Sequence, residues 1–189
     1  MWALVESGSV SKVYTRPKSI TVGDIQYPSN IFMLWNSSEL EAIGIYEVVI
    51  DNTNYKDPEY YINTSQSFAF GSGKVTATYG TATAKPLDDS GSGDTLVRGL
   101  KYMHSQTIDN QAYGLLQPND WMVVRNAESS KAIPSDWLDY RVAVRTAASS
   151  MRTKINAVAN VDALAALYVY NDATPPVRPL GDWPTEPTS

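Results

Sequence analysis

The stretch that decides the fold of this chain reads GLLQPNDWMVVRNAE over residues 114–128 and, after a short gap, IPSDWLDYRVAVR over residues 133–145. Pro118 is suited to the first turn of a helix, and Ser135 can cap the start of a second helix. Each part also carries a tryptophan, a large side chain that favours burial. The stretch therefore predicts two helices joined by a short capped turn.

The second of these helices is expected to run from residue 136 to residue 158. Its apolar side chains recur at intervals of three and four, which is typical of a helix that packs on other helices. The stripe consists of Trp137, Tyr140, Val144, Ala147, Met151, Ile155 and Val158. Weaker helical patterns over 95–116 and 161–168 extend the prediction to a helical domain over residues 95–170.

Residues 1–85 follow a different pattern, in which β-prone runs alternate with turn-forming residues. Three turn signals, Ser7-Gly8-Ser9, Gly23-Asp24 and Gly71-Ser72-Gly73, each separate two such runs and predict three hairpins. One short helix over 37–43, stopped by Gly44, interrupts them. The sequence thus predicts an α+β fold with an antiparallel β domain before the helical one.

Two further segments complete the predicted organisation. Residues 86–94 are rich in turn formers and charge, which indicates a linker. Residues 171–189 contain five prolines and cannot form a helix or a central strand, so an extended tail is expected. Leu180 and Trp183 make this tail apolar enough to dock, either on its own domain or on a neighbouring molecule.

Composition excludes several classes of function. The 189 residues carry a net charge of −5 and neither half is basic, so no nucleic-acid partner is expected. The absence of cysteine excludes disulfides, thiol nucleophiles and thiolate metal sites. We find no signal-peptide pattern and no apolar run of about 18 residues, so no membrane insertion is expected.

Candidate chemical groups are sparse. The single histidine, His104, has no carboxylate near it in sequence and is expected to be solvated on a helix face. Three carboxylate pairs fit caps or solvated charges better than a glycosidase pair: Glu39/Glu41, Asp88/Asp89 and Asp136/Asp139. We therefore predict no catalytic, cofactor-binding or metal-binding residue, and expect that the protein is not an enzyme.

Aromatic side chains gather between residues 55 and 79, and two interpretations of them stay open. They suit either the core of a strand pair or a surface that stacks on sugars or on protein. The residues are Tyr55, Tyr60, Tyr61, Phe68, Phe70 and Tyr79.

Two tryptophan–arginine pairs stand out in the helical part. Arg125 follows Trp121 by four residues, and Arg141 follows Trp137 by the same interval. Residues four apart share a helix face, so each guanidinium can lie over the indole of its partner. We expect both pairs to show this stacking and to order the two helices.

The same residues carry a resemblance to a known family. The run Leu115-Leu-Gln-Pro-x-Asp-Trp121, then Val124-Arg125, and later Tyr140-Arg141-x-Ala-x-Arg145, resembles the C-terminal domain of bacteriophage tail-fibre assembly and accessory proteins. Further along, Asp182-Trp183-Pro184 is similar to the end of such chains. The N-terminal β region is also similar, through Pro17-x-x-Ile-x-Val22 and the residues that follow it. Residues 50–95 carry no such likeness.

The resemblance implies a non-catalytic protein that binds fibre or baseplate subunits and assists or caps fibre assembly, made in the cytoplasm of the bacterial host. It alternatively implies a permanent component of the virion tail, present in several copies as a homo- or hetero-oligomer. An enzyme acting on host glycans is a third, weaker interpretation. No cofactor is implied. The expected contact residues are Trp121, Arg125, Trp137, Tyr140, Arg141, Val144, Met151, Leu180 and Trp183.

Overall fold

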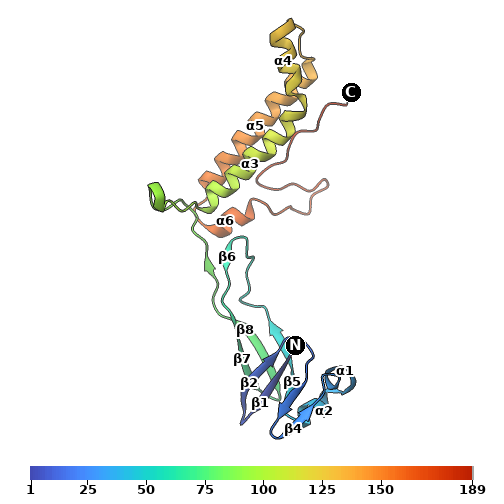
Figure 1. The fold of residues 1–189 in the computed structure, drawn as a ribbon. Coiled ribbons are helices and arrows are strands. Elements are labelled where there is room, and N and C mark those ends of the chain that lie inside the picture. The colour runs from blue at the N-terminus through green and yellow to red at the C-terminus, as the bar shows by residue number, and fades with distance from the viewer. Residues whose placement is uncertain (189) are drawn as a thin grey trace. The chain divides into compact units, whose positions relative to one another are not determined.

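The computed structural model describes residues 1–188 and separates into two compact units, which divide between Thr83 and Ala84. Strands dominate the first unit and helices the second, which confirms the α+β class (Figure 1). The division falls two residues before the boundary expected from the sequence. No helix among the described residues is long and apolar enough to cross a membrane.

The first unit is built on a five-stranded sheet with the order β2-β1-β5-β8-β7. Its strands are β1 (Trp2–Glu6), β2 (Ser9–Tyr14), β5 (Ile45–Asp51), β7 (Gln66–Gly71) and β8 (Lys74–Tyr79). Strands β5 and β8 pair in parallel, so the sheet is mixed and the expectation of a purely antiparallel sheet is wrong. The chain reaches β7 first and turns back, and β8 then inserts between β7 and β5.

The three predicted hairpins are all present. The turn between β7 and β8 consists of Ser72 and Gly73, both with positive φ (52° and 73°), as a two-residue hairpin turn that matches strand twist requires. Strands β1 and β2 are joined in the same way. The third hairpin pairs β3 (Ile20–Val22) with β4 (Ile25–Tyr27).

Each face of the sheet carries its own cluster of buried apolar side chains. On one face lie α1 (Ile31–Leu34) and α2 (Ser37–Ala42), and the capping residue of α2 is Asn36, which forms a capping box with Glu39. This face buries Leu4, Tyr14, Ile20, Ile31, Phe32, Leu40 and Ile45. The other face buries Ala3, Val48, Val75 and Ala77, with Phe68 and Phe70 packed against them, which favours the strand-core interpretation for these two rings.

A second, smaller strand pair lies where the chain passes from the first unit to the second. Strand β6 (Tyr61–Ile62) pairs with β9 (Thr83–Ala84) in a separate two-stranded ladder. Tyr60 is buried, whereas Tyr55 and Tyr79 stack on each other with ring centroids 5.0 Å apart.

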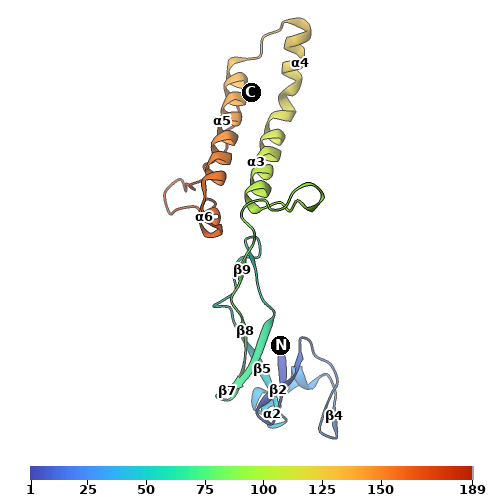
Figure 2. The same ribbon diagram turned by 90° about the vertical axis from the view of Figure 1, so that its left-hand side faces the viewer.

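The second unit is a helical hairpin. One arm consists of α3 (Leu100–Leu116), the 3-10 turn η2 (Gln117–Asn119) and α4 (Asp120–Ser129), and the other arm is α5 (Ser135–Ala157). Helix α3 lies alongside α5 in both views, and α6 (Val161–Ala166) follows (Figures 1 and 2). The predicted stripe forms the core, with Tyr140, Val144, Met151 and Ile155 all buried. Pro134 rather than Ser135 precedes the first turn of α5, and Ala148 rather than Ala147 is the buried alanine.

The segment 86–94, predicted as a linker, folds against the start of α3. The backbone N–H groups of Leu100 and Lys101 donate to the carbonyls of Pro86 and Leu87. Asp89 accepts from the Gly99 N–H at 2.8 Å and pairs with Arg98 at 2.5 Å. These bonds satisfy donors that a helix N-terminus leaves without partners, which explains why this polar segment is ordered. Residues 93–95 form the short 3-10 helix η1 (Gly93–Thr95).

Candidate functional site

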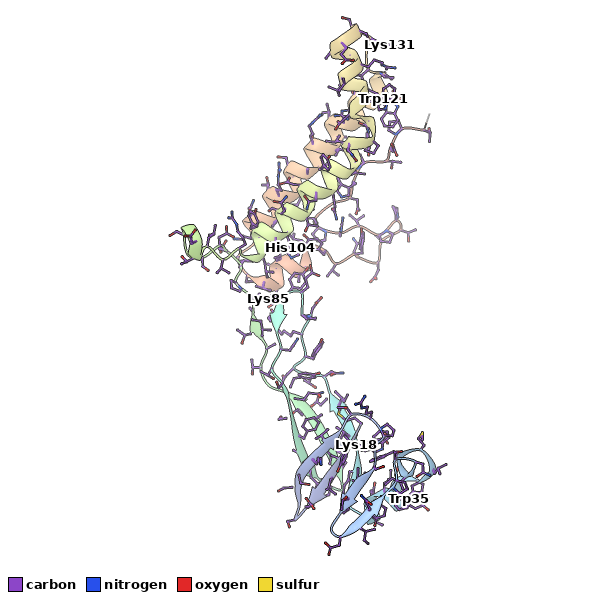
Figure 3. The ribbon with its side chains drawn as sticks, viewed as in Figure 1. Lys18, Trp35, Lys85, His104, Trp121 and Lys131 are labelled. Atoms are coloured by element: carbon purple, nitrogen blue, oxygen red, sulfur yellow. The ribbon has the colours of Figure 1, made fainter. Side chains whose placement is uncertain are left out.

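The free end of the helical hairpin exposes apolar side chains on both of its arms. On α4, Trp121 and Val124 are 53% and 54% exposed, and on the first turn of α5, Leu138 is 49% exposed. Of the residues in α4 only Met122 is buried. We call Trp121, Val124 and Leu138 the hairpin-end residues; Figure 3 labels Trp121 near this end.

Trp121 is held by the arginine one turn further along α4. The Arg125 Cζ atom lies 4.7 Å from the centroid of the Trp121 ring, as the spacing of the pair predicts. The Arg125 Nε atom is buried and has no hydrogen-bond partner among the described residues. The guanidinium thus covers part of the indole and leaves the rest of the ring facing solvent.

The second pair does not repeat this stacking, and the expectation for Trp137 and Arg141 is wrong. Arg141 turns inward, is 4% exposed, and donates to the Leu116 carbonyl at 3.0 Å, to Asn119 Oδ1, and to Asp120 Oδ1 at 2.6 Å. A buried guanidinium needs several acceptors, and the junction between α3 and α4 supplies them. Trp137 instead packs edge-on against Tyr140, with centroids 6.0 Å apart.

Arg141 therefore has a structural function. It fastens α5 to the point where the first arm of the hairpin passes through the 3-10 turn η2, and it orders the start of α4. Asn119, which is also buried, donates from its amide to the Leu115 carbonyl. Beyond this anchor the two arms have few side chains to bury between them.

Several predicted contact residues belong to the core and not to a surface. Tyr140, Val144, Met151 and Leu180 are all buried within the second unit, so they cannot contact a separate molecule without unfolding. For the three residues on α5, periodic spacing is the reason for the wrong assignment, because a stripe on a helix looks the same whether its partner is internal or external. Among the predicted contact residues, Trp121 is more than half exposed and can therefore contact another molecule.

The proline-rich tail docks on its own helical unit, which decides between the two possibilities left open by the sequence. Leu180 is buried, and Trp183 donates from Nε1 to Gln111 Oε1 on α3 at 3.2 Å. Lys154 on α5 donates to the carbonyls of Pro179 and Leu180 at 2.8 and 3.2 Å. Burial raises the pKa of the Tyr140 phenol, and the nearby Glu186 carboxylate of the tail raises it further.

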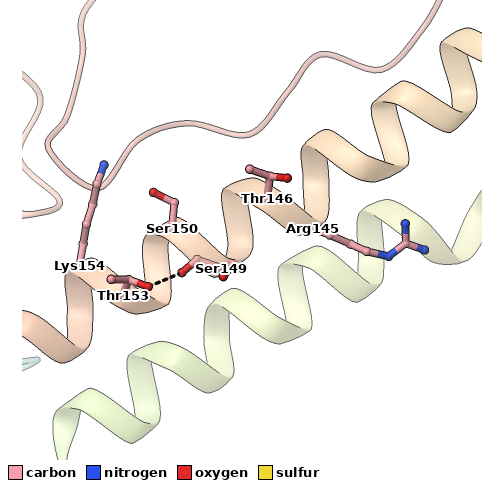
Figure 4. Close-up of a pocket in the computed structure, with 6 residues that line it drawn as sticks. All are labelled: Arg145, Thr146, Ser149, Ser150, Thr153 and Lys154. Atoms are coloured by element: carbon pink, nitrogen blue, oxygen red, sulfur yellow. Dashed lines mark hydrogen bonds between the residues drawn. The ribbon is translucent and has the colours of Figure 1, made fainter.

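A groove runs along the outer face of α5 (Figure 4). It has a volume of about 640 Å³ and is lined by Arg145, Thr146, Ser149, Ser150, Thr153 and Lys154. Its hydroxyl groups are not activated, since Thr153 donates to the Ser149 carbonyl at 2.9 Å and no histidine or carboxylate lines the groove. Lys154 is already committed to the tail, so the groove offers a small polar surface and no reactive group.

The groups that could do chemistry have structural partners. His104 is 7% exposed and its Nδ1 atom lies 2.8 Å from the Tyr168 hydroxyl, so the expectation of a solvated histidine is wrong. Asp88 pairs with Lys101 at 2.9 Å, and Glu39 caps α2. Within residues 1–188 no three histidine or acidic side chains gather as a metal site.

The carboxyl group of Asp89 has a lowered pKa. Its pKa is lowered first by the hydrogen bond from the Gly99 backbone N–H and then by Arg98. Both partners belong to the start of α3, which makes this carboxylate part of the anchoring of that helix.

A pocket in the first unit escaped the sequence analysis. Trp2, Phe32, Trp35 and Glu47 line it, and these residues come from β1, α1, the residue after α1, and β5. No sequence signal could have joined them, because they are distant along the chain and are brought together by the register of β1 with β5 and by the packing of α1 on the sheet.

Comparisons of the chain with models of known protein families, with curated proteins and with solved structures find no match. The resemblance to tail-fibre accessory proteins therefore depends on the motif residues named above.

Proposed function

We propose that this protein is a non-catalytic module of a bacteriophage tail fibre, which binds fibre or baseplate subunits and assists or caps fibre assembly. The observation that carries the proposal is the exposure of apolar side chains on both arms at the hairpin end. Tryptophan is among the residues most enriched in the energetic centres of protein interfaces, and Trp121 is held ready by Arg125.

The anchor at Arg141 supports the same interpretation. It uses a buried charged group to fix the junction of α3 and α4, although an apolar residue there would bury more easily. The benefit is a defined geometry for α4, whose side chains are otherwise exposed. A rigid helix that presents an aromatic side chain is well suited to dock on another polypeptide.

The motif resemblance supplies the class of partner. The proteins that share this motif act on the fibres of viruses infecting bacteria, and on this ground we propose a fibre subunit of the same virus as the binding partner. Synthesis in the bacterial cytoplasm follows from this proposal. A role without catalysis agrees with the structural engagement of His104, Asp88 and Asp89.

Co-expression in bacteria with the fibre subunit and purification through a tag on the fibre tests the proposal. Val124→Asp places a charge at the hairpin end and is expected to abolish co-purification. Val169→Asp is the matched control, since Val169 is also an exposed valine of the second unit (65%) and is not a hairpin-end residue. Equal capture of both variants would reject the hairpin end as the contact surface.

A second candidate function is a permanent structural component of the virion. It is favoured by two further exposed apolar side chains in the first unit, Met33 and Leu34 on α1. A protein packed permanently in a particle has more than one surface that neighbouring subunits cover. Mass spectrometry of purified virus particles separates the two. A stoichiometric amount of this protein in the particle favours the structural component, and its absence favours the assembly factor.

A further inference from the structure

The pocket in the first unit has a size and a lining that select for a particular kind of ligand. Its volume is about 160 Å³, about five times the share of liquid volume of one water molecule. Three aromatic side chains line it, Trp2, Phe32 and Trp35, together with Ser37, Leu40, Ile45 and the exposed residue Glu47. A pocket of this volume holds the head of one side chain or one small ion, and it is too small for a nucleotide.

The fold fixes these groups next to one another. Trp2 on β1 is the direct cross-strand partner of Glu47 on β5, so both side chains stand on the same face of the sheet. The Trp2 and Phe32 rings lie with centroids 4.9 Å apart and planes tilted by 51°. Trp35, labelled in Figure 3, is held edge-on by Tyr27 at 5.7 Å.

The chemistry of this lining favours a cation. Aromatic faces carry negative potential and attract ammonium groups, most strongly when the ring is an indole. Glu47 forms no ion pair and no side-chain hydrogen bond within residues 1–188, so its charge is available to a ligand. An anion would be repelled by this carboxylate.

Two lysines of the first unit lie over a ring next to Trp2 and do not line the pocket. Lys12 and Lys18 lie over the Tyr14 ring, at 5.8 and 5.3 Å from its centroid. Tyr14 is the cross-strand partner of Trp2 on the side opposite Glu47, and neither lysine lines the pocket.

We propose that Trp2, Phe32, Trp35 and Glu47 form a binding site for an alkylammonium cation, such as the head of a lysine side chain or a quaternary ammonium group. The aromatic rings contact the alkyl groups of the cation, and the Glu47 carboxylate balances its charge. This site belongs to the first unit and does not depend on the function proposed for the hairpin end.

Nuclear magnetic resonance of the full ¹⁵N-labelled chain tests the proposal, with tetramethylammonium chloride as the probe at constant ionic strength. The indole N–H signals of Trp2 and Trp35 are expected to shift in a saturable manner, while that of Trp137 stays in place. Neopentyl alcohol, a neutral molecule of nearly the same shape, is expected to cause no saturable shift.

Two variants separate charge from aromatic character. Glu47→Gln is expected to weaken binding by about threefold, in line with a partly exposed ion pair. Trp35→Leu keeps an apolar side chain and is expected to weaken binding by about fivefold. Glu41→Gln is the matched control, since Glu41 is an exposed glutamate of α2 that does not line the pocket. It is expected to bind like the unaltered chain.

The source of the cation follows from two further titrations. Tighter binding of Nα-acetyl-lysine methylamide than of choline identifies a polypeptide lysine, and the reverse order identifies a quaternary ammonium group. The proposal is overturned if neither Trp2 nor Trp35 shows a saturable shift, if neopentyl alcohol acts as tetramethylammonium does, or if Glu47→Gln and Glu41→Gln bind equally well.

Discussion

The two halves of the helical hairpin differ in how far their apolar side chains are buried. We call the part where α3 lies alongside α5 the closed half. Its side chains Ile108, Met151 and Ile155 are almost fully buried. At the free end, Trp121 and Val124 on α4 are more than half exposed. The boundary between the halves is the buried Arg141, which ties α5 to the α3–α4 junction. The comparison teaches that apolar periodicity identifies a helix face that needs a partner, but not whether that partner is in the same chain.

The largest expected difference between the halves is in their response to loss of side-chain volume. Ile155→Ala is expected to reduce the free energy of unfolding by about 2–5 kcal/mol, because it leaves a cavity in a packed core. Val124→Ala is expected to change it by less than about 0.5 kcal/mol. Urea denaturation of the two variants measures both values. Similar losses in the two variants would show that the free end is packed as well as the closed half.

The sequence was sufficient for much of this architecture. Local signals were strong in the β7–β8 turn, where Ser72 and Gly73 adopt positive φ, and in the stripe of α5. Parallel pairing of β5 with β8 could not be predicted, because it joins strands that are separated along the chain by two others, β6 and β7. Pairing of this kind is decided by packing of the whole sheet and not by neighbouring residues.

The candidate sites were less predictable than the fold. Trp121–Arg125 and Trp137–Arg141 have the same spacing, yet only the first pair stacks. The difference arises because acceptors at the α3–α4 junction face Arg141, a fact of tertiary structure. His104 was likewise misjudged, since its partner Tyr168 lies 64 positions away along the chain.

Removal of the tail tests how far the closed half depends on it. Because Leu180 is buried, we expect truncation after Asn171 to reduce the free energy of unfolding of the second unit by about 2–4 kcal/mol. Thermal denaturation followed by circular dichroism at 222 nm (a helix signal) measures the loss. An unchanged transition would show that the tail does not stabilise the second unit, and Leu180 would then remain a candidate contact residue.

The boundary residue itself can be removed. Arg141→Met keeps an apolar side chain of similar length but leaves the acceptors at Leu116 and Asn119 without this donor. We expect a loss of about 1–3 kcal/mol, the usual penalty for unsatisfied buried polar groups. Hydrogen exchange is expected to become faster in α4 than in the closed half. Uniform acceleration across both arms would contradict the anchoring role of Arg141.

The smallest expected effect concerns the other end of α3. Asp89 has a pKa below its ordinary value of 3.8 in the folded chain, so its ionised form stabilises the fold above that value. This contribution is lost as the pH falls through the lower, folded pKa. The difference in melting temperature between the unaltered chain and Asp89→Asn is therefore expected to shrink from about pH 6 to about pH 2. Asp94→Asn, in the same loop, is the control; a difference for Asp89→Asn that stays constant with pH would argue against the shift.

Site-specific photo-crosslinking in bacteria that produce the fibre subunit tests the central claim most directly. A photoreactive amino acid at position 124 is expected to form a covalent product with the fibre subunit, and the same group at position 169 is expected to form none. Crosslinking that is absent at position 124, or equal at the two positions, would contradict the claim that the hairpin end is the docking surface.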